Sequence, residues 1–92
     1  MLLFVAGSEA NSIAALENFQ RLREAVRERC DLKLRIVDVL DDYRAALEHK
    51  VFVTPCLVLV EPAPKVMLVG TLRDTAKVRA ALRLPPLVHG DA

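Results

Sequence analysis

The residues of this sequence best suited to covalent chemistry are its two cysteines, Cys30 and Cys56. They stand 26 positions apart, so they form neither a Cys-x-x-Cys pair nor part of a metal-ligand cluster. Thiol enzymes of comparable size place a cysteine of low pKa at the N-terminus of a helix, where the helix dipole stabilises the thiolate. The loop before the first expected helix, Ser8 to Ser12, contains neither cysteine nor histidine. The sequence therefore predicts no catalytic residue.

Other residues with chemical potential are isolated or have simpler explanations. His49 and His89 stand far from each other in the sequence and from either cysteine, which argues against a metal site. Asp41 and Asp42 form a carboxylate pair, but acidic residues are also favoured at the start of a helix, and we adopt that interpretation. Neither glycine-rich phosphate-binding motif occurs. We expect no metal and no other cofactor.

Charge and composition exclude several classes of partner. Thirteen basic residues are offset by twelve acidic ones, and the net charge of +1 gives no global attraction to nucleic acid or to an anionic membrane. The apolar runs are far shorter than the roughly 18 to 20 residues that cross a bilayer. The N-terminus lacks the basic segment of a signal peptide, so a cytoplasmic location is expected. We attribute the apolar content of 53% to an oligomer or partner surface.

Hydrophobic periodicity predicts four strands and three helices. The strands are expected at residues 2–6, 32–39, 56–60 and 65–69. Apolar residues at three- and four-residue spacing predict a long helix, capped by Asn11 or Ser12 and ending near Arg29. A short helix opens at residues 41–42 and continues through Tyr43, Ala46 and Leu47. The last helix is expected to open at Thr71, in a Thr-x-x-acid pattern, and to stop before the prolines at 85–86.

This order of elements predicts an α/β fold with a four-stranded mixed sheet. The first two strands should be parallel, and the last two should form an antiparallel hairpin. Pro55 at the start of the third strand, after Val53 and Thr54, is typical of thioredoxin-like domains, where this proline is cis. The predicted fold class is therefore thioredoxin-like. One domain is expected over residues 1–86, followed by a disordered tail at 87–92.

Two basic residues are candidates for partner binding. Lys33 and Arg35 alternate out of the second strand, which this fold places at or near a sheet edge. Cations there are suited to guiding an added strand or an acidic loop. The alternative is that they protect the edge from aggregation.

Four segments, in one consistent order over about residues 2–84, resemble the KaiB family. They are Phe4 to Ser12 with Ala15-Leu16; Ile36 to Leu40; Val53-Thr54-Pro55 with Leu57 and a turn at Pro62 and Pro64; and Val69-Gly70 with Leu72, Asp74, Lys77 and Val78. The resemblance implies a non-catalytic, protein-binding clock component. Such proteins bind the hexameric RecA-like ATPase KaiC and also KaiA, and compete with the KaiB-like sensor domain of the histidine kinase SasA. Lys50 matches a family lysine near the KaiC-facing surface.

The resemblance also implies two alternative folds, because family members switch the second half of the chain between a tetramer-forming fold and a monomeric thioredoxin-like fold. Only the latter binds KaiC. Here Ala81 stands where family clock proteins commonly have glycine, and Arg83 where they commonly have an acidic residue. Alanine is favoured over glycine by about 1 kcal/mol inside a helix, and a cation is favoured in its last turn. With Pro55 and Gly70, these residues are expected to determine the fold, which should rest in the thioredoxin-like state.

Other departures leave the biological setting open. Thr71 replaces the family's usual aspartate, and the acidic tail is reduced to Asp91, so a timing or stress-response system fits as well as a circadian clock. A monomer and a homo-oligomer both remain possible. The alternative functions are a thioredoxin-like redox protein that relies on Cys56 alone and a structural subunit held by a homodimer contact.

Overall fold

The computed structural model describes residues 1–61 and 64–84, and the seven elements within them follow the expected order. The strands are β1 (Leu2–Val5), β2 (Arg35–Asp38), β3 (Cys56–Leu59) and β4 (Val66–Val69). The helices are α1 (Ala10–Val26), α2 (Tyr43–Glu48) and α3 (Thr75–Ala81). The turn at Pro62 and the expected tail at 87–92, with the prolines before it, lie outside the described residues.

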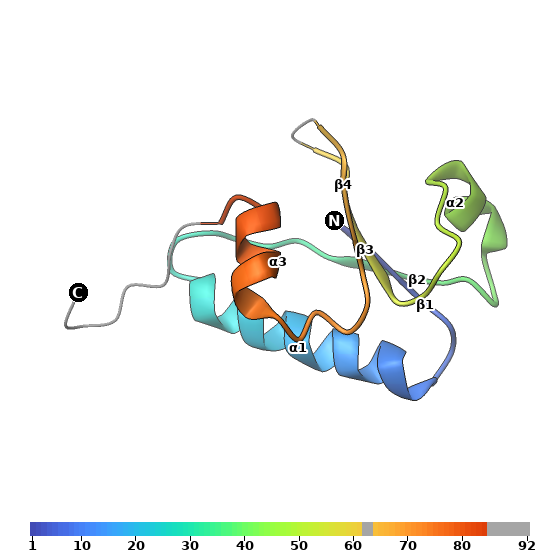
Figure 1. The fold of residues 1–92 in the computed structure, drawn as a ribbon, viewed down its shortest axis with the longest axis horizontal. Helices are drawn as coiled ribbons and strands as arrows, with labels where there is room; N and C mark the ends of the chain where they lie inside the picture. The colour runs from blue at the N-terminus through green and yellow to red at the C-terminus, as the bar shows by residue number, and fades with distance from the viewer. Residues whose placement is uncertain (62–63, 85–92) are drawn as a thin grey trace.

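The four strands form one mixed sheet in the order β2-β1-β3-β4 (Figure 1). β1 is parallel to β2 and antiparallel to β3, and β3 and β4 form an antiparallel pair. The parallel first pair and the hairpin of the last two strands are thus confirmed, and so is the thioredoxin-like α/β class. Because β2 and β4 lie at the two ends of this order, each has one unpaired edge.

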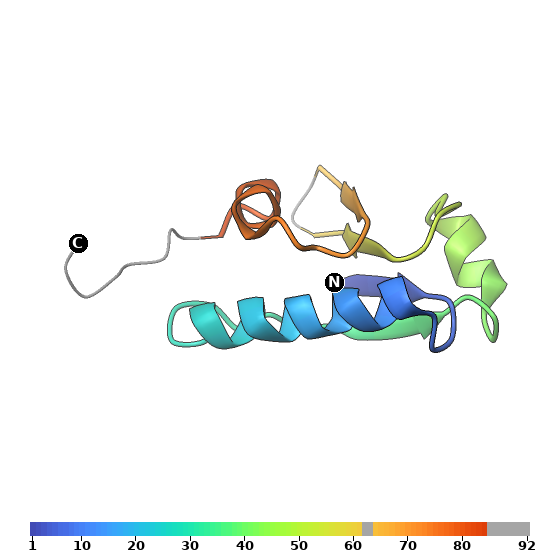
Figure 2. The same ribbon diagram turned by 60° about the horizontal axis from the view of Figure 1, so that its bottom comes forward.

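The two faces of the sheet are covered unequally. On one face, Leu3 and Val5 of β1 and Leu57 of β3 pack against α1 and α3 in the larger apolar cluster. On the other face, Phe4 and Cys56 belong to a smaller cluster that includes α2. α2 stands at the opposite end of the sheet from α3, and α1 lies along the sheet (Figures 1 and 2).

The first helix begins earlier than its polar residues suggest. Its N-cap is Glu9, whose carboxylate accepts a hydrogen bond of 2.8 Å from the Asn11 N–H. Ser12, one of the two expected caps, is fully buried, and its hydroxyl accepts a hydrogen bond of 3.1 Å from the Ala6 N–H. The capping prediction is wrong because Ser12 ties the helix to the end of β1. The expected helix end at Arg29 lies in a turn, three residues beyond Val26.

The last helix starts later than predicted. Asp74 is the N-cap of α3, and its carboxylate accepts a hydrogen bond of 3.2 Å from the Lys77 N–H. Thr71 therefore does not open the helix, and the expected Thr-x-x-acid cap is wrong. The reason is Leu72, which is buried in the larger cluster and has a left-handed backbone with φ of 63°. Burying this side chain requires a loop between Gly70 and the helix.

α2 and α3 end in the same way, on a cation with left-handed backbone. Lys50 follows α2 with φ of 58°, and Arg83 follows α3 with φ of 57°. The N–H of the next residue, Val51 or Leu84, reaches back five residues to a helix carbonyl, at 2.8 and 3.0 Å. This is the Schellman pattern, in which glycine is usual at the left-handed position. Arg83 therefore lies beyond the helix and not in its last turn, while Ala81 is the last residue of α3.

Replacing Arg83 with glycine is expected to raise the free energy of unfolding by about 1 kcal/mol, because the substitution relieves a conformation that side chains with a Cβ disfavour. Urea denaturation followed by circular dichroism measures this change. Ala80→Gly is the matched control, since it places glycine within α3 and should lower stability by about 0.5 to 1 kcal/mol. A loss of stability in Arg83→Gly would contradict this account of the helix end.

Candidate partner-binding surface

The loop before α1, where a thiol enzyme would hold its cysteine, is organised by an aspartate. Asp38, at the end of β2, accepts hydrogen bonds through one carboxylate oxygen from the N–H of Gly7 at 3.1 Å and of Leu40 at 3.0 Å. Gly7 has φ of 56°, a conformation that suits glycine. The arrangement joins the end of β1 to the segment that leads into α2. The Asp38 carboxylate therefore serves to fix the backbone of this loop.

Cys56 is packed as a small apolar residue. The Thr54-Pro55 peptide bond is cis, as predicted, and Cys56 follows it at the start of β3. The cysteine is fully buried, in a cluster with Phe4, Val51 and Val58. Burial raises the pKa of the Cys56 thiol, and the charge of Lys65 only partly opposes this effect. The protonated thiol is a poor nucleophile, so this environment does not favour the redox alternative.

The remaining candidates for chemistry are not assembled into a site. Cys30 is half-buried against the larger cluster, and both cysteines are free. His49 packs on the ring of Phe4, with ring centroids 5.8 Å apart. Over residues 1–61 and 64–84, no three His, Cys, Asp or Glu side chains lie together as metal ligands would. His89 falls outside these residues.

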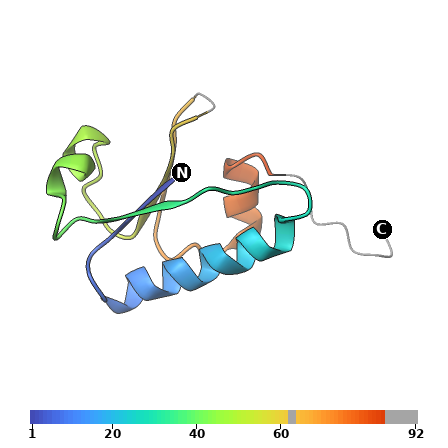
Figure 3. The ribbon, with the colours of Figure 1, turned by 180° about the vertical axis from the view of Figure 1, so that it is seen from behind.

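The β2 edge holds the two basic residues singled out from the sequence. Arg35 is the first residue of β2, and its N–H donates to the Met1 carbonyl at 2.9 Å. Lys33 precedes the strand, which starts later than predicted, and its carbonyl accepts a hydrogen bond of 3.0 Å from the N-terminal ammonium. Both side chains are exposed. Figure 3 follows this segment from the end of α1 towards α2.

Arg35 also faces the second helix. It lines a hollow of about 330 Å³ together with Arg44, Glu48 and His49 of the α2 region and with Asp42. The Asp42 carboxylate caps α2 by accepting a hydrogen bond of 3.2 Å from the Ala45 N–H. The hollow thus brings two arginines, from β2 and α2, together with the carboxylates of Asp42 and Glu48.

Lys50 lies at the far end of α2, directly after His49, and its side chain is exposed. The ammonium of Lys65 donates a hydrogen bond of 2.9 Å to the His49 carbonyl, which joins the end of α2 to the residue before β4. Lys33 and Arg35 therefore share an edge, and Arg35 and Lys50 flank α2. The left-handed backbone of Lys50 was not predicted from sequence. The local sequence does not indicate this conformation, because glycine is the usual residue at the left-handed position after a helix.

Sequence reasoning missed the exposed apolar side chains of the 40–53 segment. Of the three residues named for the short helix, only Ala46 is buried. The others are exposed, as are three more large apolar residues of the segment. The set is Leu40, Tyr43, Leu47, Phe52 and Val53, each more than half exposed and Phe52 80% exposed. The exposure of Phe52 and Val53 could have been suspected from the sequence, because both residues lie outside any predicted strand. Exposed apolar groups gathered in one segment are typical of an interaction surface.

The fold and this surface together define a class of protein. The chain is a thioredoxin-like α/β domain that has no thiol at the head of α1 and that exposes apolar and basic side chains on the 40–53 segment and at the β2 edge. None of the described helices is long and apolar enough to span a membrane.

A family model described as a KaiB domain matches residues 2–84, and the chain belongs to the KaiB family. The circadian clock oscillator protein KaiB of Synechococcus elongatus is 37% identical over 82 residues, which cover 89% of this chain and 79% of that protein. Its counterpart in Picosynechococcus is 36% identical over 86 residues, with coverage of 89% and 78%. The clock protein KaiB1 of Synechocystis is 34% identical over 82 residues, with coverage of 89% and 77%.

Iodoacetamide is expected to modify Cys30 at least about tenfold faster than Cys56 in the folded protein, because Cys56 is buried and its pKa is raised. Mass spectrometry of peptides after timed quenching measures both rates. The same reaction in urea should remove the difference. A fast reaction at Cys56 in the native protein would revive the redox alternative.

Proposed function

We propose that this chain is a non-catalytic binding module that docks onto a KaiC-like hexameric ATPase in a timing or stress-response system. The observation that supports it most is the proximity in the chain of a basic strand edge and five exposed apolar side chains. The family relationship supports a clock role in general terms. A KaiA-like protein or a histidine kinase is a further partner under this proposal.

The β2 edge is suited to strand addition. The N–H groups of Arg35 and Val39 donate to carbonyls at the two ends of β1, at 2.9 Å each. In a parallel pair, every second residue of a strand directs its backbone N–H and C=O to the same neighbour. Because Arg35 and Val39 face β1, Ile36 directs its backbone groups to the outer edge. Ile36 is also half exposed, between the cation Arg35 and the buried Val37. An incoming strand would meet free backbone groups, an apolar side chain and a cation at this edge.

The 40–53 segment supplies the apolar part of the proposed interface. Large exposed side chains such as Tyr43 and Phe52 are the kind that contribute most to binding when a partner buries them. Lys50 stands between the end of α2 and Phe52, where it adds a cation to this apolar surface. A lysine at a position that favours glycine is consistent with a role for its side chain.

The thioredoxin-like state supports the same proposal. The family resemblance implies that this state is the one that binds KaiC, and α3 is formed here through Ala81. We propose that Ala81 favours this state, that Arg83 does not because its left-handed backbone lies beyond the end of α3, and that Pro55 and Gly70 shape the turns on either side of the β3–β4 hairpin. Gly70 has φ of 113°, which is strained for any residue with a side chain.

Reversing the charges in Lys33→Glu, Arg35→Glu and Lys50→Glu is expected to weaken binding to KaiC-like hexamers, by at least about fivefold for the triple variant. Pull-down and biolayer interferometry with ATP- and ADP-loaded hexamers measure the effect. Arg27→Glu, at the exposed residue that follows α1, is the matched control with the same change of charge per site. Wild-type affinity in the triple variant would refute the assignment of these residues.

Truncating Phe52 to alanine is expected to separate binding from stability. The side chain is 80% exposed, so the free energy of unfolding should change by less than about 0.5 kcal/mol. Binding to the hexamer should fall by about tenfold or more if the ring enters a pocket of the partner. Phe4→Ala, which removes a fully buried ring, is the contrasting control and should destabilise the fold. Unchanged hexamer affinity of Phe52→Ala would exclude the Phe52 side chain from the interface.

A further inference from the structure

The second open edge of the sheet, along β4, has the features of a separate binding site. The Gly70 N–H donates to the Pro55 carbonyl at 2.9 Å, which marks these two residues as a hydrogen-bonded pair. Along the antiparallel register, the next such pairs are Leu68 with Leu57 and Val66 with Leu59. The backbone groups of Met67 and Val69 therefore point outward. Within the described part of the chain they have no backbone partner.

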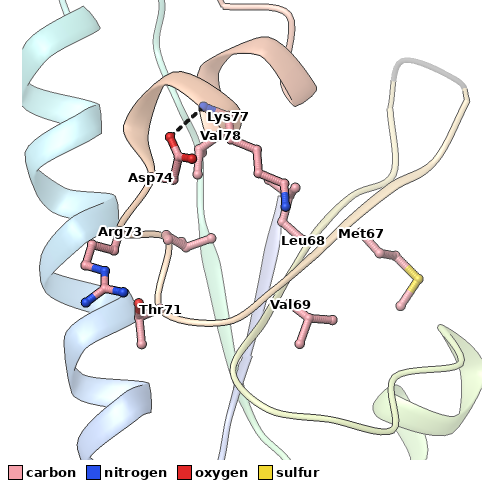
Figure 4. A pocket seen from close by; sticks show the side chains of 9 residues that line it. Met67, Leu68, Val69, Thr71, Arg73, Asp74, Lys77 and Val78 are labelled. Carbon is pink, nitrogen blue, oxygen red and sulfur yellow. Dashed lines mark hydrogen bonds between the residues drawn. The ribbon is translucent and has the colours of Figure 1, made fainter.

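A groove of about 480 Å³ runs along this edge, between β4 and α3. Figure 4 shows that the Lys77 side chain extends from α3 towards Leu68 of β4. Arg73 also lines the groove but points towards α1. The one acidic residue of the lining, Asp74, already accepts the Lys77 N–H as the cap of α3. The lining therefore holds two cations and one carboxylate, and Lys77 is the cation that lies along β4.

The two sides of the β4 edge differ in chemistry. Leu68 turns towards the larger apolar cluster, on the side where Lys77 overhangs the strand. Met67 and Val69 point to the opposite side and are 39% and 63% exposed. A strand added beside β4 would place alternate side chains on these two sides. Acidic residues would then meet Lys77, and apolar residues would lie beside Met67 and Val69.

We propose that β4 is a second docking edge, which takes an extended segment of a partner protein in which acidic and apolar residues alternate. The segment adds as a fifth strand and hydrogen-bonds to the outward backbone groups of Met67 and Val69. This site goes beyond the proposed function, because it lies at the other end of the sheet from Lys33 and Arg35. A chain with both edges occupied joins two partners through one sheet.

A synthetic peptide of alternating Glu and Val residues, with an alternating Lys and Val peptide as its control, provides the probe. Amide hydrogen exchange followed by NMR is expected to show fast exchange at Met67 and Val69 in the free protein and slowed exchange once the acidic peptide is added. Leu68, whose N–H faces β3, should be protected throughout. Equal protection by the basic peptide, or no protection by the acidic one, would overturn the proposal.

Variants test the two recognition elements separately. Met67→Pro removes an outward N–H that the β3–β4 ladder does not use, which an edge strand tolerates, and Met67→Thr is the matched control that keeps it. Met67→Pro and Lys77→Glu are each expected to weaken acidic-peptide binding by about tenfold, measured by fluorescence anisotropy. Met67→Thr should bind within about twofold of wild type. An affinity for the acidic peptide that neither Met67→Pro nor Lys77→Glu alters would refute the β4 site.

Two further outcomes separate this inference from its alternatives. Lys33→Glu, at the opposite edge, should leave acidic-peptide binding unchanged even where it weakens binding to the ATPase hexamer. Loss of peptide binding in Lys33→Glu alone would assign the peptide to β2 and overturn the proposal. Light scattering tests the other occupant, a second copy of the chain. Self-association that Met67→Pro abolishes would show that β4 pairs with itself and would likewise overturn it.

Discussion

The double pairing of β1 is the constraint on which the rest of the molecule depends. This strand lies between β2 and β3, and its residues Leu3, Phe4 and Val5 are buried on both faces of the sheet. A parallel partner on one side and an antiparallel partner on the other fix the positions of both halves of the chain. Because the order is β2-β1-β3-β4, the strands with open edges are β2 and β4. Both surfaces to which we assign binding are consequences of that order.

Unequal coverage of the sheet explains where the apolar surface lies. α1 has seventeen residues and packs with α3 over one face, whereas α2 has six residues on the other. A helix of that length buries only Ala46 and leaves Tyr43 and Leu47 in solvent. Five of the ten large apolar side chains that are exposed in the described residues therefore belong to the 40–53 segment. A partner that covers this segment would bury what the domain itself does not.

The class of fold was predictable because periodicity and topology determine it, whereas helix ends depend on tertiary contacts. Short apolar runs separated by an amphipathic helix are sufficient for the mixed sheet. The cap of α1 was not predictable, because Ser12 is used to bind the end of β1 and Glu9 takes its place. The start of α3 is delayed by the burial of Leu72 in the same manner. Candidate cations were identified from their alternation, but the groove beside Lys77 arises only once α3 packs beside β4.

The pairing of β1 with β3 also governs the order in which the chain acquires its structure. Leu3 aligns with Leu57, a partner from the second half of the sequence. During synthesis β1, α1 and β2 leave the ribosome while one side of β1 still lacks its neighbour. Contacts of such long sequence separation slow folding, and an unfilled strand invites pairing with other chains. The nascent N-terminal half is thus the stage of this protein's life most exposed to misassembly, until β3 arrives to complete the centre of the sheet.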